Sequence, residues 1–203
     1  TSQAMSLQIS NSEAINNAVE QLSVEVTNIS RRSSVQADVI FGAKSTTQFI
    51  EGVDFDRESD IFEAMIPVEG SPANIANEPL GIILPADTAQ TIQAVPGETV
   101  LLRLSTVTGQ SSVGEVPLVA TVEAAQSMGI SRAYMHLSTV NELIGLEPGN
   151  FQTFTVYLED ARLMNEAARE LTDLLSSDLN VVDRNETQTS QFGGFGFGLQ
   201  DDE

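Results

Sequence analysis

The chain has 203 residues, enough for one domain or two small ones, and 41% of them are hydrophobic, an ordinary share for a globular protein. Its formal net charge of −20 repels phosphate groups, which argues against binding to nucleic acid and against docking directly on anionic lipid. Because the chain has no cysteine, disulfides, thiolate metal sites and thiol nucleophiles are excluded.

The start of the chain predicts a piece of a longer protein. It opens on the polar Thr1, with neither an initiator methionine nor a signal peptide, and no apolar run approaches the ~20 residues that cross a bilayer. We expect a fragment or processed product with further segments flanking it.

The first predicted element is an amphipathic helix from Ser10 to about Ser30. Apolar residues recur there at steps of three and four, namely Ile15, Ala18, Val19, Leu22, Val26 and Ile29. Arg31 and Arg32 follow directly, where cations complement the dipole at a helix C-terminus; a docking site is the alternative. A strand is expected over Gln36–Phe41.

The region 43–75 contains the acidic run Asp54, Asp56, Glu58 and Asp60. Its alternating carboxylates suggest a calcium loop, but an EF-hand needs glycine at the sixth position and glutamate at the twelfth. Ser59 and Met65 stand at those positions, which favours a solvated turn over a metal site. Short strands are expected over 46–50 and 63–68.

The stretch 81–104 predicts a buried strand, a short helix after Pro85, a turn at Pro96 and Gly97, and a second strand. A connection follows over Ser105–Gly114. The next expected strand is Val116–Val122, where Pro117 indicates an edge position, since proline cannot donate to a sheet ladder.

The C-terminal third predicts alternating strands and helices. Ser138 fits the N-cap of a short helix that ends at Gly145. On the last helix, Asp160, Glu166 and Glu170 are expected to pair with Arg162 and Arg169. The elements expected here are a strand over 133–137, the short helix, a strand over 152–158, a helix over 160–176 and a strand over 179–182.

Together these elements predict an α+β fold. An α/β sandwich subdomain of the β-α-β type, split in sequence, comprises 1–42 and 131–184. A mainly β subdomain is inserted over 43–130, and 185–203 form a flexible tail rich in glycine and phenylalanine.

No pattern predicts a catalytic, cofactor-binding or metal site, so we expect a binding module and not an enzyme. His136 is the only histidine and has no Asp or Ser at a triad spacing, which favours packing or a hydrogen bond. One group of apolar residues has two interpretations, a surface that contacts a partner or substrate, or the core of the inserted subdomain. That group is Phe49, Ile50, Phe55, Ile61 and Phe62.

From about Gln36 to Asp183 the chain resembles the extracytoplasmic (periplasmic core) domain of MacB/FtsX-like ABC transporter permeases, a group that includes the lipoprotein-releasing permeases. The segments that carry the resemblance are GVDFDRESDIF (52–62), GIILPADTAQTIQAVPGETVLLRL (81–104), VPLVATVEAA (116–125), SRAYMHLSTVNELIGL (131–146) and FQTFTVYLEDARLMNEAARELTDLL (151–175).

The resemblance implies a domain on the outer side of the cell membrane, between two transmembrane helices, that moves when cytoplasmic ATPases bind nucleotide. It implies as partners a cytoplasmic ATPase subunit acting through the parent permease, a second permease copy or homologue, and an extracytoplasmic accessory protein or lipoprotein. Efflux, lipoprotein release and cell-wall regulation are all compatible with it. The alternative function is a free-standing secreted interaction or adhesion domain.

Overall fold

The computed structural model describes residues 12–123 and 131–178, which form two compact units. Among the described residues, unit 1 comprises those from Arg31 to Gln152, and unit 2 combines those before Arg31 with those after Gln152. The chain therefore passes between the units at 30/31 and at 152/153. Within the described ranges, no helix is both long and apolar enough to cross a membrane.

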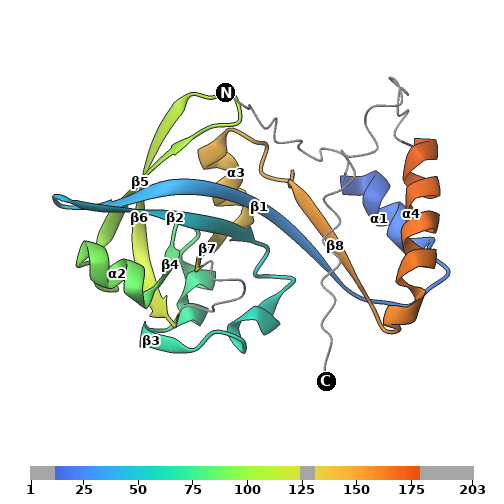
Figure 1. Cartoon of the computed structure of the whole chain (residues 1–203), viewed down its shortest axis with the longest axis horizontal. Helices are drawn as coiled ribbons and strands as arrows, with labels where there is room; N and C mark the ends of the chain where they lie inside the picture. Colours follow the sequence, from blue (N-terminus) through green and yellow to red (C-terminus); the bar gives the residue numbers. More distant parts are fainter. Residues whose placement is uncertain (1–11, 124–130, 179–203) are drawn as a thin grey trace. The chain divides into compact units, whose positions relative to one another are not determined.

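Unit 1 is built on a mixed sheet whose strands pair in the order β2-β7-β4-β6-β5-β1 (Figure 1). Because β1 also pairs with β2, the pairing of these six strands closes on itself, while β3 pairs with β6 outside this ring. The strands are β1 (Val26–Phe41), β2 (Lys44–Val53), β3 (Pro67–Gly70), β4 (Ile82–Pro85), β5 (Thr99–Ser105), β6 (Ser111–Val122) and β7 (Arg132–His136).

The long hairpin of β1 and β2 contains the predicted strands over 36–41 and 46–50, and both are confirmed. Gly42 adopts a positive φ of 58° in the tight turn, a conformation that glycine reaches without steric cost. The strand expected over 63–68 is mostly wrong, because a 3-10 helix, η1 (Ser59–Phe62), precedes it and β3 begins only at Pro67.

The stretch 81–104 folds as predicted, with β4, helix α2 (Ala86–Ile92) and β5 in that order. Alternation along β5 shows why a half-buried strand forms here: Val100 and Leu102 are buried, and Leu101 between them is exposed. Pro85 occupies the N-cap position of α2, one residue before the first helical position expected for it.

Helix α3 (Leu137–Ile144) follows β7 without a break, so Ser138 lies inside the helix and the predicted serine N-cap is wrong. Its end is as predicted, because Gly145 takes φ +81° and the N–H of Leu146 donates to the carbonyl of Asn141 at 2.7 Å. Val140 and Ile144 on α3 pack into the main core together with the buried faces of β4, β5 and β6.

A second, smaller apolar cluster lies beside η1 and the 3-10 helix η2 (Pro72–Asn77). Its buried members include Val53, Phe55, Ile75 and Ile83, and Ile61 and Phe62 pack against it partly buried. His136 joins it: its Nε2 lies 2.7 Å from the carbonyl oxygen of Ile75, and its ring meets the ring of Phe55 edge-on at 5.1 Å. The predicted packing role of His136 is confirmed.

Unit 2 contains α1 (Ser12–Glu20), the start of β1, strand β8 (Thr153–Leu158), η3 (Ala161–Leu163) and α4 (Met164–Asp178), and α1 contacts α4. The predicted helix over 10–30 is wrong beyond Glu20. From Val26 the chain is a strand that adjoins β8, with the Thr27 hydroxyl donating to the carbonyl of Tyr157 at 3.1 Å. The β-branched residues Val26, Thr27 and Ile29 suit a strand, so the sheet partner overrides the helical spacing.

Helix α4 buries Ala167, Leu171 and Leu175 along one stripe, but it starts at Met164 and not at Asp160. Of the predicted charge pairs, Asp160 and Arg162 meet at 2.7 Å on the exposed surface. Glu170 instead accepts hydrogen bonds from Ser23, from its hydroxyl at 2.7 Å and from its backbone N–H at 3.1 Å. These bonds tie α4 to the segment between α1 and β1.

The hydrogen bonds from Ser23 lower the pKa of Glu170 below its ordinary value. The bond from the hydroxyl has the larger effect and the bond from the backbone N–H the smaller one. The resulting stabilisation is present above the ordinary glutamate pKa and is lost as the pH falls through the lowered one. We expect Glu170→Gln to destabilise the chain at pH 7, and its difference from the unsubstituted chain to shrink on acidification. Urea denaturation followed by circular dichroism at several pH values measures this.

The control for that prediction is Glu166→Gln, which removes the same charge from an exposed position on the same helix. The assigned role of Ser23 would be contradicted if Glu170→Gln changed the free energy of unfolding by the same amount at every pH, and by no more than Glu166→Gln does.

The limits of the two units differ from those of the predicted subdomains. Segment 43–130 is predicted as an insertion, but its strands β2, β4 and β5 pair with β1 or β7, and its strand β6 lies between β4 and β5 in the same sheet. The sandwich arrangement of 1–42 with 131–184 stays a prediction. The strand expected over 179–182, the start of the first helix at Ser10 and the tail over 185–203 lie outside the described residues.

Candidate functional site

The apolar residues singled out in the sequence do not share one surface. Phe49 is 45% exposed on β2, whereas its neighbour Ile50 is 1% exposed, because adjacent side chains of a strand point to opposite faces. Phe55 is also buried and stacks on the partly buried Phe62, with ring centroids 5.2 Å apart. The predicted contact with a partner is therefore wrong for Ile50 and Phe55, because both belong to hydrophobic cores. Ile61 packs against one of these cores and is partly buried. A contact role for Phe49 stays a prediction.

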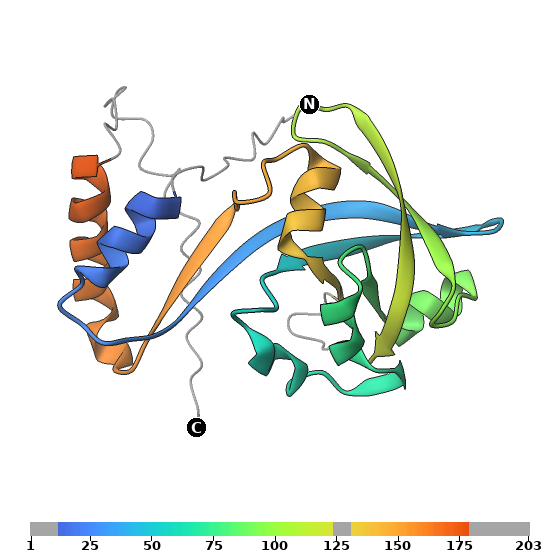
Figure 2. The same ribbon diagram turned by 180° about the vertical axis from the view of Figure 1, so that it is seen from behind.

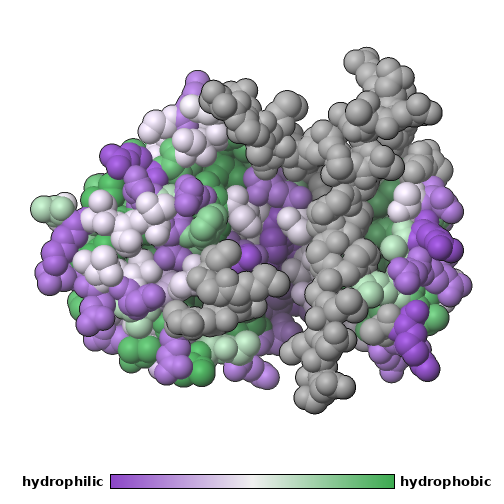
Figure 3. Space-filling model, in the orientation of Figure 1, coloured by the Kyte–Doolittle hydropathy of each residue, from purple (hydrophilic) through white to green (hydrophobic). Residues whose placement is uncertain are grey.

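Sequence reasoning missed the exposed apolar residues around β3. Ile66 and Val68 are each 57% exposed, and Figure 3 shows hydrophobic residues beside hydrophilic ones along the edge of unit 1 where Figure 1 places this strand. The sequence indicates this strand only weakly, because a four-residue segment that begins with a proline is hard to distinguish from a loop.

The acidic run 54–60 is not the uniformly solvated turn expected. Asp54 pairs with the exposed Arg57, Nε to Oδ2 at 3.3 Å, but the Glu58 side chain is only 7% exposed. Both carboxylate oxygens of Glu58 accept hydrogen bonds from the guanidinium of Arg32. The described part of the chain holds no group of three or more histidines and carboxylates that could bind a metal ion.

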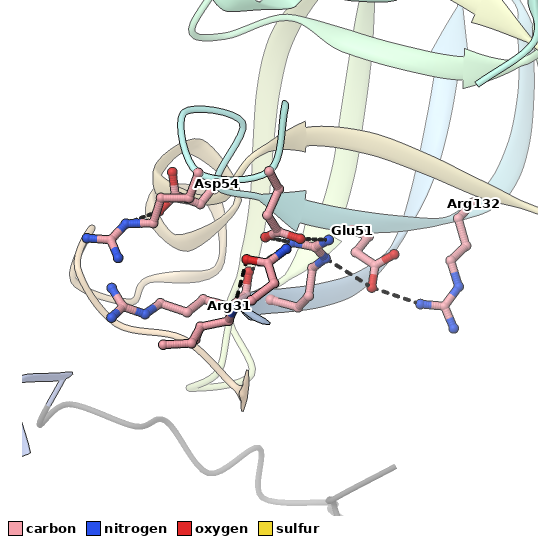
Figure 4. A network of polar contacts seen from close by, with 9 residues as sticks. Arg31, Glu51, Asp54 and Arg132 are labelled. Carbon is pink, nitrogen blue, oxygen red and sulfur yellow. Dashed lines mark hydrogen bonds and ion pairs between the residues drawn. The ribbon is translucent and has the colours of Figure 1, made fainter. Parts of the chain in front are cut away.

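Arg32, on β1, is the centre of a network of charges. Figure 4 shows this network from close by, with Arg31, Glu51, Asp54 and Arg132 labelled. The Nε of Arg32 also lies 3.9 Å from Oε1 of Glu51 on β2, and the same oxygen accepts a hydrogen bond from Arg132 on β7 at 3.0 Å. The side chains of Arg32 and Glu51 are 16% and 17% exposed, and that of Arg132 is 46% exposed. The network therefore ties three strands and the turn after β2 together.

Arg31 precedes Arg32 on β1, and its guanidinium lies over the ring of the fully buried Phe151 at 5.4 Å. Burial lowers the pKa of Arg31 below its ordinary value; the charge of Arg57 adds to this decrease and that of Asp54 opposes it. Both arginines lie in a strand, so their predicted role at a helix C-terminus is wrong.

A buried polar cluster adjoins this network through Ser33. Its hydroxyl donates to Oδ1 of Asn141 on α3 at 2.6 Å. The amide of Asn141, which is 0% exposed, donates to the carbonyl oxygens of Glu147, Pro148 and Asn150 at 3.3, 3.2 and 2.6 Å. One asparagine thus holds the loop that leads from α3 toward β8.

The network concentrates positive charge in a strongly acidic chain. Four of its nine cationic side chains, Arg31, Arg32, Arg57 and Arg132, gather around Glu51, Asp54 and Glu58. The Arg32–Glu58 pair is largely buried, so removing one of its partners is costly, whereas the pairs of Arg57 and Arg132 are half-exposed and contribute little stability. This arrangement holds backbone segments in place.

Comparison of the sequence with protein-family models and with curated proteins finds no match. Comparison of the fold finds similar solved structures. The extracellular domain of the noncanonic ABC-type transporter YknZ from Gram-positive bacteria has a TM-score of 0.59 at 14% identity, covering 83% of each chain.

Two further structures are similar. The periplasmic region of MacB from Actinobacillus actinomycetemcomitans has a TM-score of 0.52 at 19% identity, over 83% of this chain and 74% of that one. A permease-protein domain from Porphyromonas gingivalis has a TM-score of 0.51 at 12% identity, over 88% and 73%. The chain thus has the fold of extracellular and periplasmic domains of ABC transporter permeases, which confirms the resemblance seen in the sequence at the level of fold.

Proposed function

We propose that this chain is the extracytoplasmic domain of an ABC transporter permease subunit, which binds a partner or substrate and passes on ATP-driven conformational change without catalysing a reaction itself. The shared fold supports the general kind of protein. Within this proposal, a cytoplasmic ATPase acts through the parent permease, and a second permease copy, an accessory protein or a lipoprotein is the partner on the outer side.

The observation that carries the relay role is how unit 1 holds its two connections to the rest of the chain. The chain enters unit 1 at Arg31 and leaves it at Gln152. The N–H of Gln152 donates to the carbonyl of Arg32 at 2.9 Å, and the Gln152 side chain accepts from the N–H of Ser34 at 2.9 Å. The two connections are therefore bonded to each other.

The side chains of the same segment bond to the body of unit 1. Arg32 pairs with Glu58 and Glu51, and Ser33 bonds Asn141. A displacement applied through either connection is thus distributed over β1, β2, β7 and α3, so that unit 1 moves as one body. A rigid attachment of this kind is what a domain needs to follow motion that starts elsewhere in a transporter.

The relay can be tested by spin labelling in the full transporter, because this chain has no native cysteine that would react with the label. Spin labels on Lys44→Cys in unit 1 and Asp173→Cys in unit 2 report the distance between the units. We expect the distance distribution to differ between the nucleotide-free and ATP-bound states. A control pair within unit 1, Lys44→Cys with Gln110→Cys, should not change, because both positions are exposed and belong to the same unit.

Identical distributions in both nucleotide states, with an active ATPase, would contradict the relay. A parent protein that carries no membrane-spanning segment would contradict the permease assignment itself and favour the secreted interaction domain.

A further inference from the structure

Strand β6 has an open edge along its first half. Over Ser111–Pro117 it pairs with β5 on one side, whereas β4 pairs with its other side only from Leu118 onward. Pro117 stands at this boundary, where an absent N–H costs no ladder bond, so the predicted edge position is correct locally although β6 is interior further along.

The backbone directions follow from the bonds of Leu118. Its N–H donates to the carbonyl of Glu98, and its carbonyl accepts from the N–H of Gly97, both at 2.8 Å, so both groups face β5. Direction alternates along a strand, so the N–H and C=O groups of Val113 and Glu115 face the open side. Among the described residues they have no hydrogen-bond partner there.

A hollow of about 270 Å³ lies beside this edge and under α3. Figure 2 shows α3 next to the hairpin of β5 and β6. The apolar part of the lining is Leu80, Val116 and Leu143; the polar part is Ser112, Thr139, Glu115 and Glu142. Both glutamates are exposed, and the lining contains no lysine or arginine. We call this hollow, with the open edge of β6, the β6 groove.

We propose that the β6 groove binds an extended segment of a partner protein, which adds a short strand to the open edge and carries a lysine or arginine beside apolar residues. Main-chain hydrogen bonds to Val113 and Glu115 supply the attachment, as in other complexes formed by strand addition. The carboxylates of Glu115 and Glu142 attract the cation, and Leu80 and Leu143 contact its apolar neighbours.

The charge of the chain favours a basic segment over any other. With a net charge of −20 the surface repels an acidic peptide, and no cation in the groove offsets the two carboxylates. This inference rests on the proposed function only for the side of the membrane on which the partner is encountered. The binding itself is a property of this chain.

The test uses the 203-residue chain and a blocked hexapeptide of alternating valine and lysine. One matched peptide carries glutamate in place of lysine. The other carries methyl groups on all its backbone nitrogens, which removes the donors along both edges. Binding is followed by NMR of the isotope-labelled chain. We expect saturable shifts centred on 112–116 with the lysine peptide, and at least about tenfold weaker binding of both matched peptides.

Variants of the chain distinguish binding at the β6 groove from nonspecific attraction to the negative charge of the chain. Glu115→Gln with Glu142→Gln should weaken the lysine peptide about tenfold. Glu63→Gln with Glu69→Gln removes the same charge from exposed positions outside the groove and should change binding less than about twofold. Val113→Pro removes one outward N–H, as Pro117 already does, and should weaken binding while the far-ultraviolet spectrum is kept.

Equal loss in the two double variants, or unchanged affinity of the N-methylated peptide, would overturn the proposal. So would spermidine binding as tightly as the peptide at the same site, because the groove would then hold a small cation without strand addition. None of these three results affects the distance measurements between the units, so failure of this inference and failure of the relay are separate outcomes.

Discussion

Replacing Arg32 by alanine is expected to lower the free energy of unfolding by about 3–5 kcal/mol. The substitution leaves the Glu58 carboxylate, with a side chain 7% exposed, without the guanidinium that binds both of its oxygens. Glu51 keeps Arg132, so Glu58 bears most of the loss. Urea denaturation of the chain followed by circular dichroism measures the change.

Two variants test whether the cost comes from an isolated buried charge. Arg57→Ala removes an arginine that is 57% exposed, and its effect should stay below about 1 kcal/mol. The double variant Arg32→Met with Glu58→Leu removes both charges and should be markedly more stable than Arg32→Ala. If Arg32→Ala costs no more than Arg57→Ala, the network does not hold unit 1 together, and the attachment on which the relay depends is lost.

Replacing Asn141 by leucine is expected to cost about 3 kcal/mol. Leucine fills a similar volume but donates nothing, so the carbonyl oxygens of Glu147, Pro148 and Asn150 and the Ser33 hydroxyl lose their shared partner in a site that is 0% exposed. Besides this loss of global stability, we expect a local effect: amide hydrogen exchange should become faster over 147–152.

Ser33→Ala is the matched control, because it removes one of these bonds and leaves the loop carbonyls satisfied. We expect it to cost about 1 kcal/mol without faster exchange over 147–152. Equal effects of the two variants would show that Asn141 does not fix this loop.

The parts of the fold that the sequence predicted are those that neighbouring residues determine. Pro96 and Gly97 force the turn before β5, Gly145 ends α3 through its left-handed conformation, and alternation along β5 shows which face is buried. The chain order over 81–104 was read correctly for this reason. Each of these signals depends on backbone conformation or side-chain spacing within a few residues.

Where a distant strand competes with local spacing, the sequence misled. Leu22, Val26 and Ile29 continue a helical pattern, yet the chain becomes a strand at Val26 because it pairs with β8, more than a hundred residues later. The same change moved Arg31 and Arg32 from an expected helix end into β1. Propensity is a weak prior of a few tenths of a kcal/mol per residue, and a sheet partner outweighs it.

The sequence by itself determined an acidic chain without cysteine chemistry, and the order of turns and short elements by which its fold could be recognised. Only the tertiary structure decided which charges meet, which apolar side chains are buried and which strand edge stays open. Arg32 lies 26 residues from Glu58, and the edge of β6 is free because β4 is four residues long. Such pairings arise from the closure of the sheet, which no local pattern of residues encodes.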